Sequence, residues 1–173
     1  MEFSDYFHGY ALNAVDAKGR VSLPASFRTI VEKRVHPGLA ASDYPAADRF
    51  VLVGPHDHLD CLVGFDPTYS RHLDAALEKR MSADEGFDEL RDWDKAAGNS
   101  FGYAAPANYD DAGRMVLTSI NRGMAEITNL AYFLSTGRSF QIWSPANYRK
   151  FVADQPRVLK MFDMMLAEKG VKP

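Results

Sequence analysis

The chain has 173 residues, of which 46% are hydrophobic and 25% are charged, and its formal net charge is −3. These proportions are typical of a globular protein with one ordinary domain or two small ones. No run of 18 apolar residues is present, which excludes a membrane-spanning helix on length. A start without signal-peptide features and a single cysteine indicate a cytoplasmic location. The slightly negative total gives no global support for nucleic-acid binding, so such a function would depend on how the charge is distributed.

The first predicted elements are two strands, a turn and a helix. Phe7–Val15 is an aromatic-rich candidate strand. Asp16–Gly19 favours a tight turn, because Asp can accept bonds from the following backbone and Gly tolerates positive φ. Arg20–Leu23 is expected to return as the second strand of a hairpin. A short helix then has Pro24 in its first turn, and its apolar stripe consists of Phe27, Ile30 and Val31.

A loop, a second hairpin and a helix follow. His36–Asp48 is rich in Ala, Pro and Gly, which indicates a loop. Arg49–Val53 and Leu59–Phe65 are expected to pair as a hairpin. Asp66–Pro67 is typical of an N-cap followed by the first helical position, and it predicts a helix over Thr68–Arg80.

Charge is distributed unevenly along this half of the chain. Residues 16–34 contain five basic and two acidic side chains, whereas residues 82–95 contain six acidic and two basic ones. The basic segment can meet phosphates. The acidic segment is expected to lie away from them, on the solvated face of a helix over Ala83–Ala97. The basic side chains are Lys18, Arg20, Arg28, Lys33 and Arg34.

The second half of the chain repeats the first. A shift of 94 positions superimposes Phe7–Glu32 on Phe101–Glu126 with eight identities in 26 positions. Four of them form the pattern Asp-x-x-Gly-Arg-x-x-Leu, at Asp16–Leu23 and Asp110–Leu117. A later block matches at a shift of 78, so copy one carries 16 extra residues, which we assign to the loop after the first helix. The predicted organisation is a first repeat (7–80), an acidic helical linker (81–100), a second repeat (101–153) and a terminal amphipathic helix (154–173).

Copy two predicts the same elements. Phe101–Tyr109 and Arg114–Leu117 correspond to the first hairpin, and Thr118 or Ser119 can cap the helix that follows. The later expected elements are a hairpin of Leu130–Leu134 with Phe140–Trp143, a helix over Ala146–Ala153 opened by Ser144-Pro145, and a tail helix over Arg157–Lys169. The tail places on one apolar face Val158, Leu159, Phe162, Met165 and Leu166.

The arginine after each turn is the candidate contact with nucleic acid. The rigid guanidinium of Arg20 or Arg114 can donate two bonds to a phosphate or to guanine, and a two-stranded ribbon fits the major groove. Lys18, a point charge on a flexible stem, suits phosphate. Arg28 lies one helical turn beyond and would extend the basic strip, as would its counterpart Arg122.

Both turns also allow a structural role for their arginines, because an ion pair between the aspartate and the arginine would brace the turn. The residues of this turn signature are Asp16, Gly19, Asp110 and Gly113. In copy two Ala112 replaces Lys18, and Asp111 adds an acid. We therefore expect copy two to contribute less to phosphate binding.

Two such turns, with Leu-Pro-x-x-Phe-Arg at 23–28 and a second hairpin closed by Phe140–Ser144, resemble the MraZ family over residues 6–151. The resemblance implies an α+β fold related to the AbrB swapped-hairpin (double-split β-α-β) barrel, with both halves in one chain. It implies a bacterial, nucleoid-associated transcriptional regulator. Such a regulator binds promoter direct repeats in double-stranded DNA upstream of the division and cell-wall gene cluster. It also implies a homo-oligomer, a ring, which would multiply weak contacts.

Few other residues suggest chemistry. His56, Asp57, His58 and Asp60 could bind a metal, but they fall in a predicted hairpin turn with no counterpart in copy two. Cys61 lies on a predicted strand and is expected to pack. We expect no catalytic residues, no cofactor and no metal. The alternative to a DNA-binding regulator is a ring-forming interaction scaffold whose arginines brace turns. A metal-dependent enzyme that uses the four residues named above is a third and more remote alternative.

Overall fold

The computed structural model describes residues 5–172. Pro173 lies outside the described residues, and so does Met1–Ser4, most of the segment in which the sequence showed no signal-peptide features. The strands are β1 (Tyr10–Ala14), β2 (Arg20–Ser22), β3 (Phe50–Pro55), β4 (Leu62–Phe65), β5 (Ala105–Asn108), β6 (Arg114–Val116), β7 (Leu130–Ser135) and β8 (Phe140–Trp143). The α-helices are α1 (Ala25–Val35), α2 (Pro67–Ser82), α3 (Asp94–Ala97), α4 (Ser119–Met124), α5 (Pro145–Phe151) and α6 (Pro156–Glu168). Short 3-10 turns form η1 (Ala41–Asp43) and η2 (Ala46–Asp48), and π-helical turns form η3 (Glu89–Trp93) and η4 (Gly98–Gly102).

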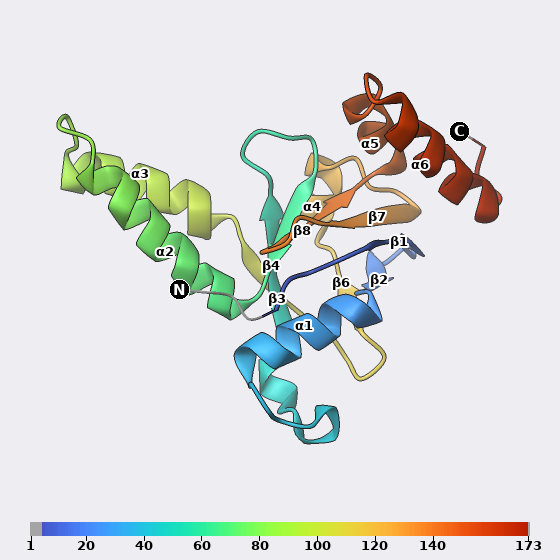
Figure 1. Cartoon of the computed structure of the whole chain (residues 1–173), viewed down its shortest axis with the longest axis horizontal. Helices are drawn as coiled ribbons and strands as arrows, with labels where there is room; N and C mark the ends of the chain where they lie inside the picture. Colours follow the sequence, from blue (N-terminus) through green and yellow to red (C-terminus); the bar gives the residue numbers. More distant parts are fainter. Residues whose placement is uncertain (1–4, 173) are drawn as a thin grey trace.

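Strands of both copies share one antiparallel sheet (Figure 1). Its order is β1-β7-β8-β4-β3-β5. The order is symmetric, because each strand of copy one occupies the place that mirrors its counterpart in copy two: β1 mirrors β5, β7 mirrors β3 and β8 mirrors β4. Strands β2 and β6 form a separate two-stranded ribbon. The predicted α+β class is confirmed. The predicted barrel is not closed within residues 5–172, because β1 and β5 lie at opposite edges of the sheet.

The first predicted hairpin of each copy is wrong, because its strands exchange partners between the copies. β1 pairs with β7, from Tyr10 opposite Leu134 to Ala14 opposite Leu130, and β5 pairs with β3. β2 pairs with β6 instead of returning along β1. β1 and β2 separate beyond their turn, and a side chain spans the gap: the Asn13 amide donates to the Ser22 carbonyl at 2.6 Å.

The second hairpin of each copy forms as predicted. β3 pairs with β4, β7 pairs with β8, and β4 and β8 join the two hairpins at the centre of the sheet. Each hairpin leads into a helix with the predicted N-cap. Asp66 accepts two backbone N–H groups at the start of α2, and Ser144 accepts one at the start of α5. Thr118, rather than Ser119, caps α4.

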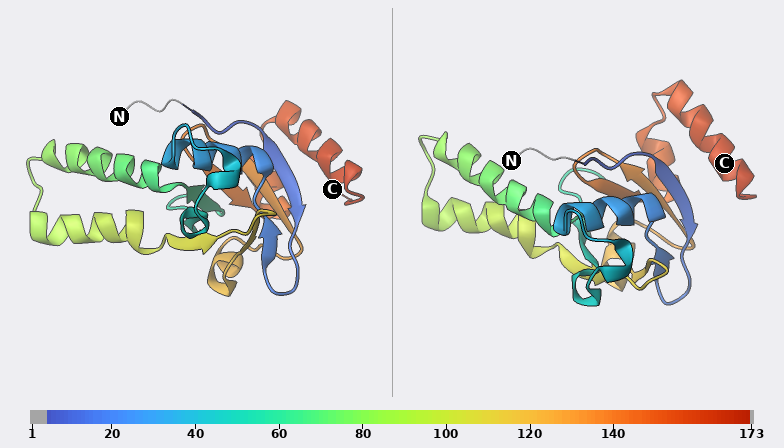
Figure 2. Two further views of the ribbon diagram at one scale, coloured as in Figure 1. Left: turned by 90° about the horizontal axis from the view of Figure 1, so that it is seen from below. Right: turned by 60° about the horizontal axis from the view of Figure 1, so that its bottom comes forward.

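Helices α2 and α3 extend from the sheet as an arm (Figure 2). The predicted acidic helix begins later than expected, because Asp84 forms a turn by accepting the Gly86 N–H at 3.0 Å and Asp88 caps η3. The helical stretch then continues through α3 and η4. This continuation displaces the start of the strand predicted from Phe101, so that β5 begins only at Ala105.

The segment predicted as a loop between the first helix and the second hairpin has structure of its own. It contains η1 and η2. A contact of 2.6 Å between His36 Nε2 and Asp48 Oδ2 joins its two ends. Tyr44 is buried at its centre, and the Tyr44 hydroxyl donates to the Asp48 carbonyl at 3.2 Å. This segment of copy one therefore forms a compact lobe, and part of the 16-residue excess lies outside it, because α1 has 11 residues and α4 has 6.

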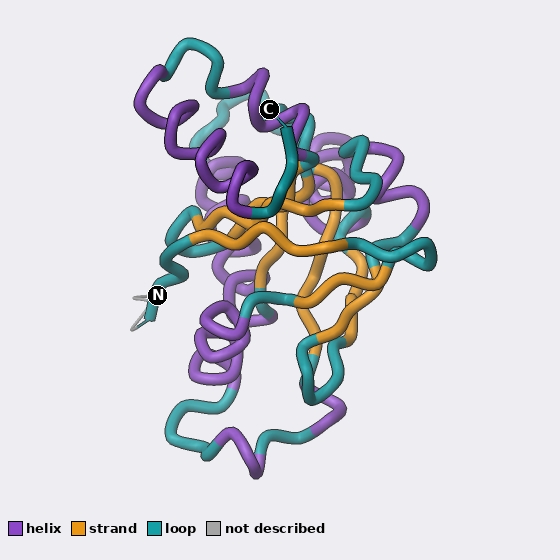
Figure 3. The backbone as a smooth tube through the Cα atoms, turned by 90° about the vertical axis from the view of Figure 1, so that its right-hand side faces the viewer, coloured by secondary structure: helices purple, strands orange, loops and turns teal. Residues whose placement is uncertain are grey.

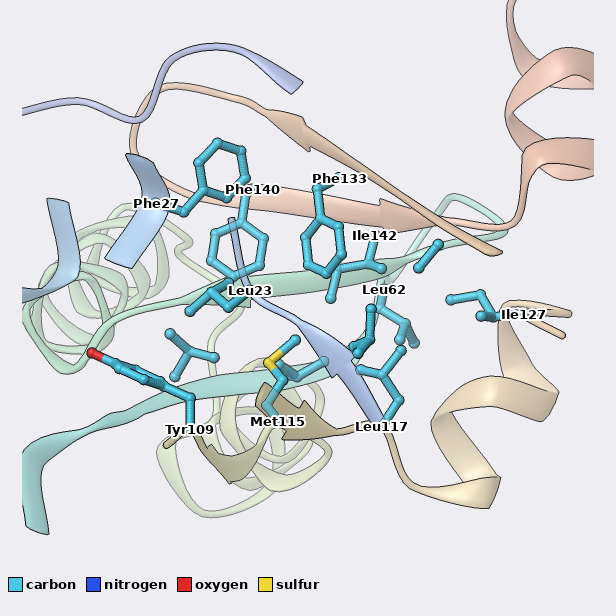
Figure 4. Packing of buried hydrophobic residues seen from close by; sticks show 14 of the residues in the cluster. Leu23, Phe27, Leu62, Tyr109, Met115, Leu117, Ile127, Phe133, Phe140 and Ile142 are labelled. Atoms are coloured by element: carbon cyan, nitrogen blue, oxygen red, sulfur yellow. The ribbon is translucent and has the colours of Figure 1, made fainter. Parts of the chain in front are cut away.

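One core holds the two copies together (Figure 4). Phe27 of α1 meets Phe140 of β8, with ring centroids 5.2 Å apart, so a helix of copy one covers a strand of copy two. Met115 and Leu117, which follow the second turn, are each 1% exposed in the same cluster. Burial of side chains this large stabilises the fold by about 1.5–3 kcal/mol each. The core therefore depends on both copies being present.

A second apolar cluster lies on the other face of the same strands, since neighbouring residues such as Tyr132 and Phe133 point to opposite faces. Helices α5 and α6 cover this cluster, and Figure 3 shows them beside the strands. The predicted apolar face of the tail is confirmed by the burial of Phe162 and Leu166. Cys61 packs in this cluster as predicted, and burial raises the pKa of its thiol to about 12. No helix in residues 5–172 is long and apolar enough to cross a membrane.

Candidate nucleic-acid interface

Both Asp-x-x-Gly-Arg sequences fold into the same turn. The Asp16 carboxylate accepts the backbone N–H groups of Lys18 and Arg20, each at 2.9 Å. Gly19 completes the turn with φ +80°, a conformation that favours glycine. The corresponding groups of copy two form the same bonds at 2.9 Å around Gly113, whose φ is +81°. Each turn therefore fixes where its arginine leaves the backbone.

These bonds lower the pKa of Asp16 and Asp110 below their ordinary value of 3.8. The largest cause is the backbone N–H of Arg20 for Asp16 and that of Arg114 for Asp110. A lowered folded pKa means that the carboxylate stabilises the turn above the unfolded pKa and that this contribution is lost as pH falls through the folded value.

We expect NMR titrations of both carboxyls to have midpoints below 3.8, because each carboxylate accepts two backbone N–H groups in the folded chain. A midpoint at or above 3.8 for either carboxyl would contradict the turn geometry.

The β2–β6 ribbon exposes one face and buries the other. Val21 and Met115, which lie opposite each other, are 2% and 1% exposed. The alternate positions face solvent, because successive side chains of a strand point to opposite faces. The outward face consists of two cross-strand pairs, Arg20 with Val116 and Ser22 with Arg114. The exchange of strands thus places one arginine from each copy on the same surface.

The two arginines of this face differ in their contacts. Arg20 Nε donates to Asp16 Oδ2 at 2.5 Å, and the Arg20 side chain is 55% exposed. Within residues 5–172, no ion pair joins Arg114 to Asp110. Lys18 is exposed at the tip of the first turn. The face therefore offers three cations, one of which also braces its turn.

The other two predicted site arginines contact the opposite turns. The Arg28 side chain lies against Gly113, and a Cβ added to Gly113 would be 2.6 Å from Arg28 Nε. The Arg122 side chain lies against Gly19 in the same way, and a Cβ added to Gly19 would be 2.9 Å from Arg122 Nε. Arg28 Nη1 also donates to the Asp111 carbonyl at 3.0 Å. Both Nε atoms are buried, and neither has a hydrogen-bond partner within residues 5–172. Arg28 and Arg122 hold the turns from behind, apart from the outward face.

Backbone bonds complete this reciprocal arrangement. The Leu23 N–H donates to the Gly113 carbonyl at 2.8 Å, and the Leu117 N–H donates to the Gly19 carbonyl at 2.9 Å. Each turn is therefore fixed by the strand end and the helix of the other copy. Sequence spacing alone could not reveal these contacts, because the residues that meet are about 90 positions apart in the chain.

Two further arginines have partners that the sequence did not indicate. Arg34, counted in the basic segment, is buried and pairs with Asp66 at 2.7 Å, so it cannot meet phosphates. Arg49 pairs with the exposed carboxylate of Asp111, the extra acid of the second turn. That acid is therefore neutralised by copy one and does not leave the second turn negatively charged.

The predicted His-x-His segment is a turn. His56 Nδ1 accepts the backbone N–H groups of His58 and Leu59 at 3.1 and 3.2 Å. Burial lowers the pKa of His56 below its ordinary value of 6.5, which keeps its ring neutral and able to accept these bonds. Among residues 5–172, no group of three or more His, Cys, Asp or Glu residues could hold a metal ion.

The fold and the ribbon together define a class: an α+β protein of two exchanged repeats that presents arginines of both copies on a two-stranded ribbon. No protein-family model matches the chain. A protein of Gluconobacter oxydans is 32% identical over 139 residues, which cover 80% of this chain and 76% of the relative. One from Gluconacetobacter diazotrophicus is 33% identical over 140 residues, 81% and 79% of the two chains. One from Beijerinckia indica is 30% identical over 170 residues, 98% and 92%.

All three relatives carry the name Transcriptional regulator MraZ. The chain belongs to the MraZ family of transcriptional regulators.

Proposed function

We propose that the chain binds double-stranded DNA with the outward face of the β2–β6 ribbon and regulates transcription through that contact. The observation that carries the proposal is the position of Arg20 and Arg114 as diagonal neighbours on one ribbon, with Cα atoms roughly 7–8 Å apart. This spacing is close to two steps along a DNA strand, at about 3.4 Å each. Ser22 and Val116, beside them, supply a hydroxyl group and methyl groups that suit base edges.

The geometry supports a role for both copies, with Arg20 and Arg114 for base edges and Lys18 for phosphate. Arg28 and Arg122 then act by positioning the turns. Three cations give limited affinity, because the electrostatic contribution scales with the phosphates that are neutralised. The proposal therefore includes a homo-oligomer, a ring of AbrB-like units at direct repeats of promoter DNA. It also includes the finer expectations of the resemblance: a target upstream of the division and cell-wall gene cluster, and association with the nucleoid.

Substitution of Arg20 tests this function. We expect Arg20→Gln to weaken binding to a G-rich direct-repeat duplex roughly 5- to 150-fold, the effect of losing one bidentate base contact. Preference for the G-rich duplex over an unrelated duplex should fall with it, and Arg114→Gln should behave alike. Lys18→Gln should instead lower the slope of log affinity against log salt concentration by about one phosphate contact. Fluorescence anisotropy across a salt series measures all of these quantities. Arg80→Gln, the same charge change on the α2 arm, is the matched control and should leave the affinity within about twofold.

The interaction scaffold remains the second candidate, because the Asp16–Arg20 ion pair is the contact expected of a bracing arginine. If Arg20→Gln lowered the melting temperature while DNA affinity stayed unchanged, bracing would be its role and the DNA proposal would fail. The mass in solution separates the candidates further. A DNA-binding ring should form a larger complex on a direct-repeat duplex, whereas a scaffold should have the same mass with and without DNA.

A further inference from the structure

A cavity of about 420 Å³, lined mostly by polar residues, lies beside the second turn. Its size is within the range of small-molecule sites. Its walls come from α1, η1, Arg49 just before β3, and the segment 109–111. The polar side chains that matter here are Arg28, Glu32, Arg49, Tyr109, Asp110 and Asp111.

Two guanidinium groups converge on this cavity. Arg49 Nη1 forms an ion pair with the Asp111 carboxylate, and Arg28 Nη1 donates to the Asp111 carbonyl. The Arg49 side chain is only 19% exposed, whereas that of Asp111 is 87% exposed. A partly buried arginine side chain thus faces an exposed carboxylate. The planar guanidinium fork matches oxyanions, phosphate above all.

The Tyr109 hydroxyl is the third donor. Tyr109 is 5% exposed, and within residues 5–172 its hydroxyl has no hydrogen-bond partner, which is uncommon for a buried polar group. Burial raises the pKa of Tyr109 well above its ordinary value of 10, so the hydroxyl keeps its proton and can donate. Arg28, Glu32 and Arg49 are its charged neighbours.

Only one copy has this arrangement within the described residues. The position that matches Tyr109 in copy one is Val15, which has no hydroxyl. The outer wall is η1, in the lobe of copy one, whereas copy two has only residues 125–129 between α4 and β7. The insertion therefore closes a cavity over the turn of the other copy.

We infer that this cavity binds a small phosphorylated ligand, whose phosphate replaces the Asp111 carboxylate on Arg49 and accepts a hydrogen bond from the Tyr109 hydroxyl. Glu32 and Asp110 also line the cavity and oppose an anion, so the ligand carries hydroxyl or amino groups that donate to them. Displacement of the Asp111 carboxylate removes the ion pair that ties the second turn, which orients Arg114, to Arg49. Ligand binding thereby changes the ribbon, and this second step rests on the proposed DNA-binding function.

Binding is tested without DNA, by calorimetric titration with inorganic phosphate at constant ionic strength. We expect Arg49→Gln to abolish binding and Tyr109→Phe to weaken it about fivefold, the usual worth of one hydrogen bond. Asp111→Asn removes the internal competitor from an exposed position and should strengthen binding up to about tenfold. Arg80→Gln, with the same charge change as Arg49→Gln, should bind phosphate as the unsubstituted chain does. Equal behaviour of these two arginine variants would overturn the phosphate site.

A DNA arm identifies the source of the phosphate. If free phosphate does not bind, yet Arg49→Gln weakens DNA binding and lowers the salt slope by about one contact, the site holds a backbone phosphate of DNA. Absence of an Arg49 effect in both arms overturns the inference. Arg20→Gln keeps the two proposals distinct, because it should lower DNA affinity and leave the titration with phosphate unchanged. A chain that binds phosphate at Arg49 but no DNA would refute the proposed function alone.

Discussion

Replacement of Asp66 by alanine is expected to lower the free energy of unfolding by about 3–5 kcal/mol, the cost of removing one partner of a buried ion pair. The Asp66 side chain is fully buried, and Oδ2 lies 2.7 Å from Nη1 of Arg34, whose side chain is 2% exposed. Without the carboxylate, the guanidinium stays in the interior over the Phe7 ring, 4.7 Å from its centroid. It retains backbone carbonyl acceptors, which carry no full charge.

The loss of the N-cap must be separated from the loss of the charge. Ser144 caps α5 at the matching position of copy two, is also buried, and is uncharged. Ser144→Ala should therefore cost only the usual cap contribution of about 1 kcal/mol. Urea unfolding of both variants gives the comparison. Equal destabilisation by Asp66→Ala and Ser144→Ala would show that the ion pair contributes nothing beyond the cap.

Features that depend on neighbouring residues could be predicted from the sequence. The Asp66 and Ser144 caps, the second hairpins and the tail helix all have signals confined to a few positions. The Asp16–Gly19 turn belongs with them, since its bonds join residues at most four apart. Such elements depend on bonds between residues close in the sequence, so the local sequence pattern is sufficient to predict them.

The exchange of strands could not be predicted, because duplication makes the alternatives equivalent. Phe7–Val15 and Phe101–Tyr109 have the same pattern, and either could pair within its own copy or with the other. The tertiary structure selects one of these pairings: β1 pairs with β7, and β2 then pairs with β6. The same choice decides which candidate arginines share a surface.

The distribution of exposed charge was equally hidden, because a count of charges does not distinguish exposed from buried groups. Arg34 adds to the positive charge counted for residues 16–34, yet in the structure it is buried and pairs with Asp66. Arg28 raises it as well, yet its side chain lies against the Gly113 turn. Arg114 lies outside that segment and still joins Arg20 on the ribbon.

Replacement of Gly19 by alanine is the sharpest test of the exchanged turns. A Cβ at this position would lie 2.5 Å from the Leu117 carbonyl oxygen and 2.9 Å from Arg122 Nε, and φ is +80°. The left-handed conformation costs about 1–2 kcal/mol, and the overlap adds about 1–3 kcal/mol. We expect Gly19→Ala to lower the free energy of unfolding by about 2–5 kcal/mol in urea titrations.

Two other glycines separate the contributions. Gly38 has nearly the same φ, +82°, with nothing within 4 Å of its would-be Cβ, so Gly38→Ala measures the backbone cost alone. At Gly113 the nearest atoms belong to the flexible Arg28 side chain, which can move, so its cost should be intermediate. The order Gly19, Gly113, Gly38 follows only if each turn is packed against the other copy. Equal costs at Gly19 and Gly38 would mean that the turns are independent, and Arg20 and Arg114 would then lose the shared ribbon on which the proposed DNA contact rests.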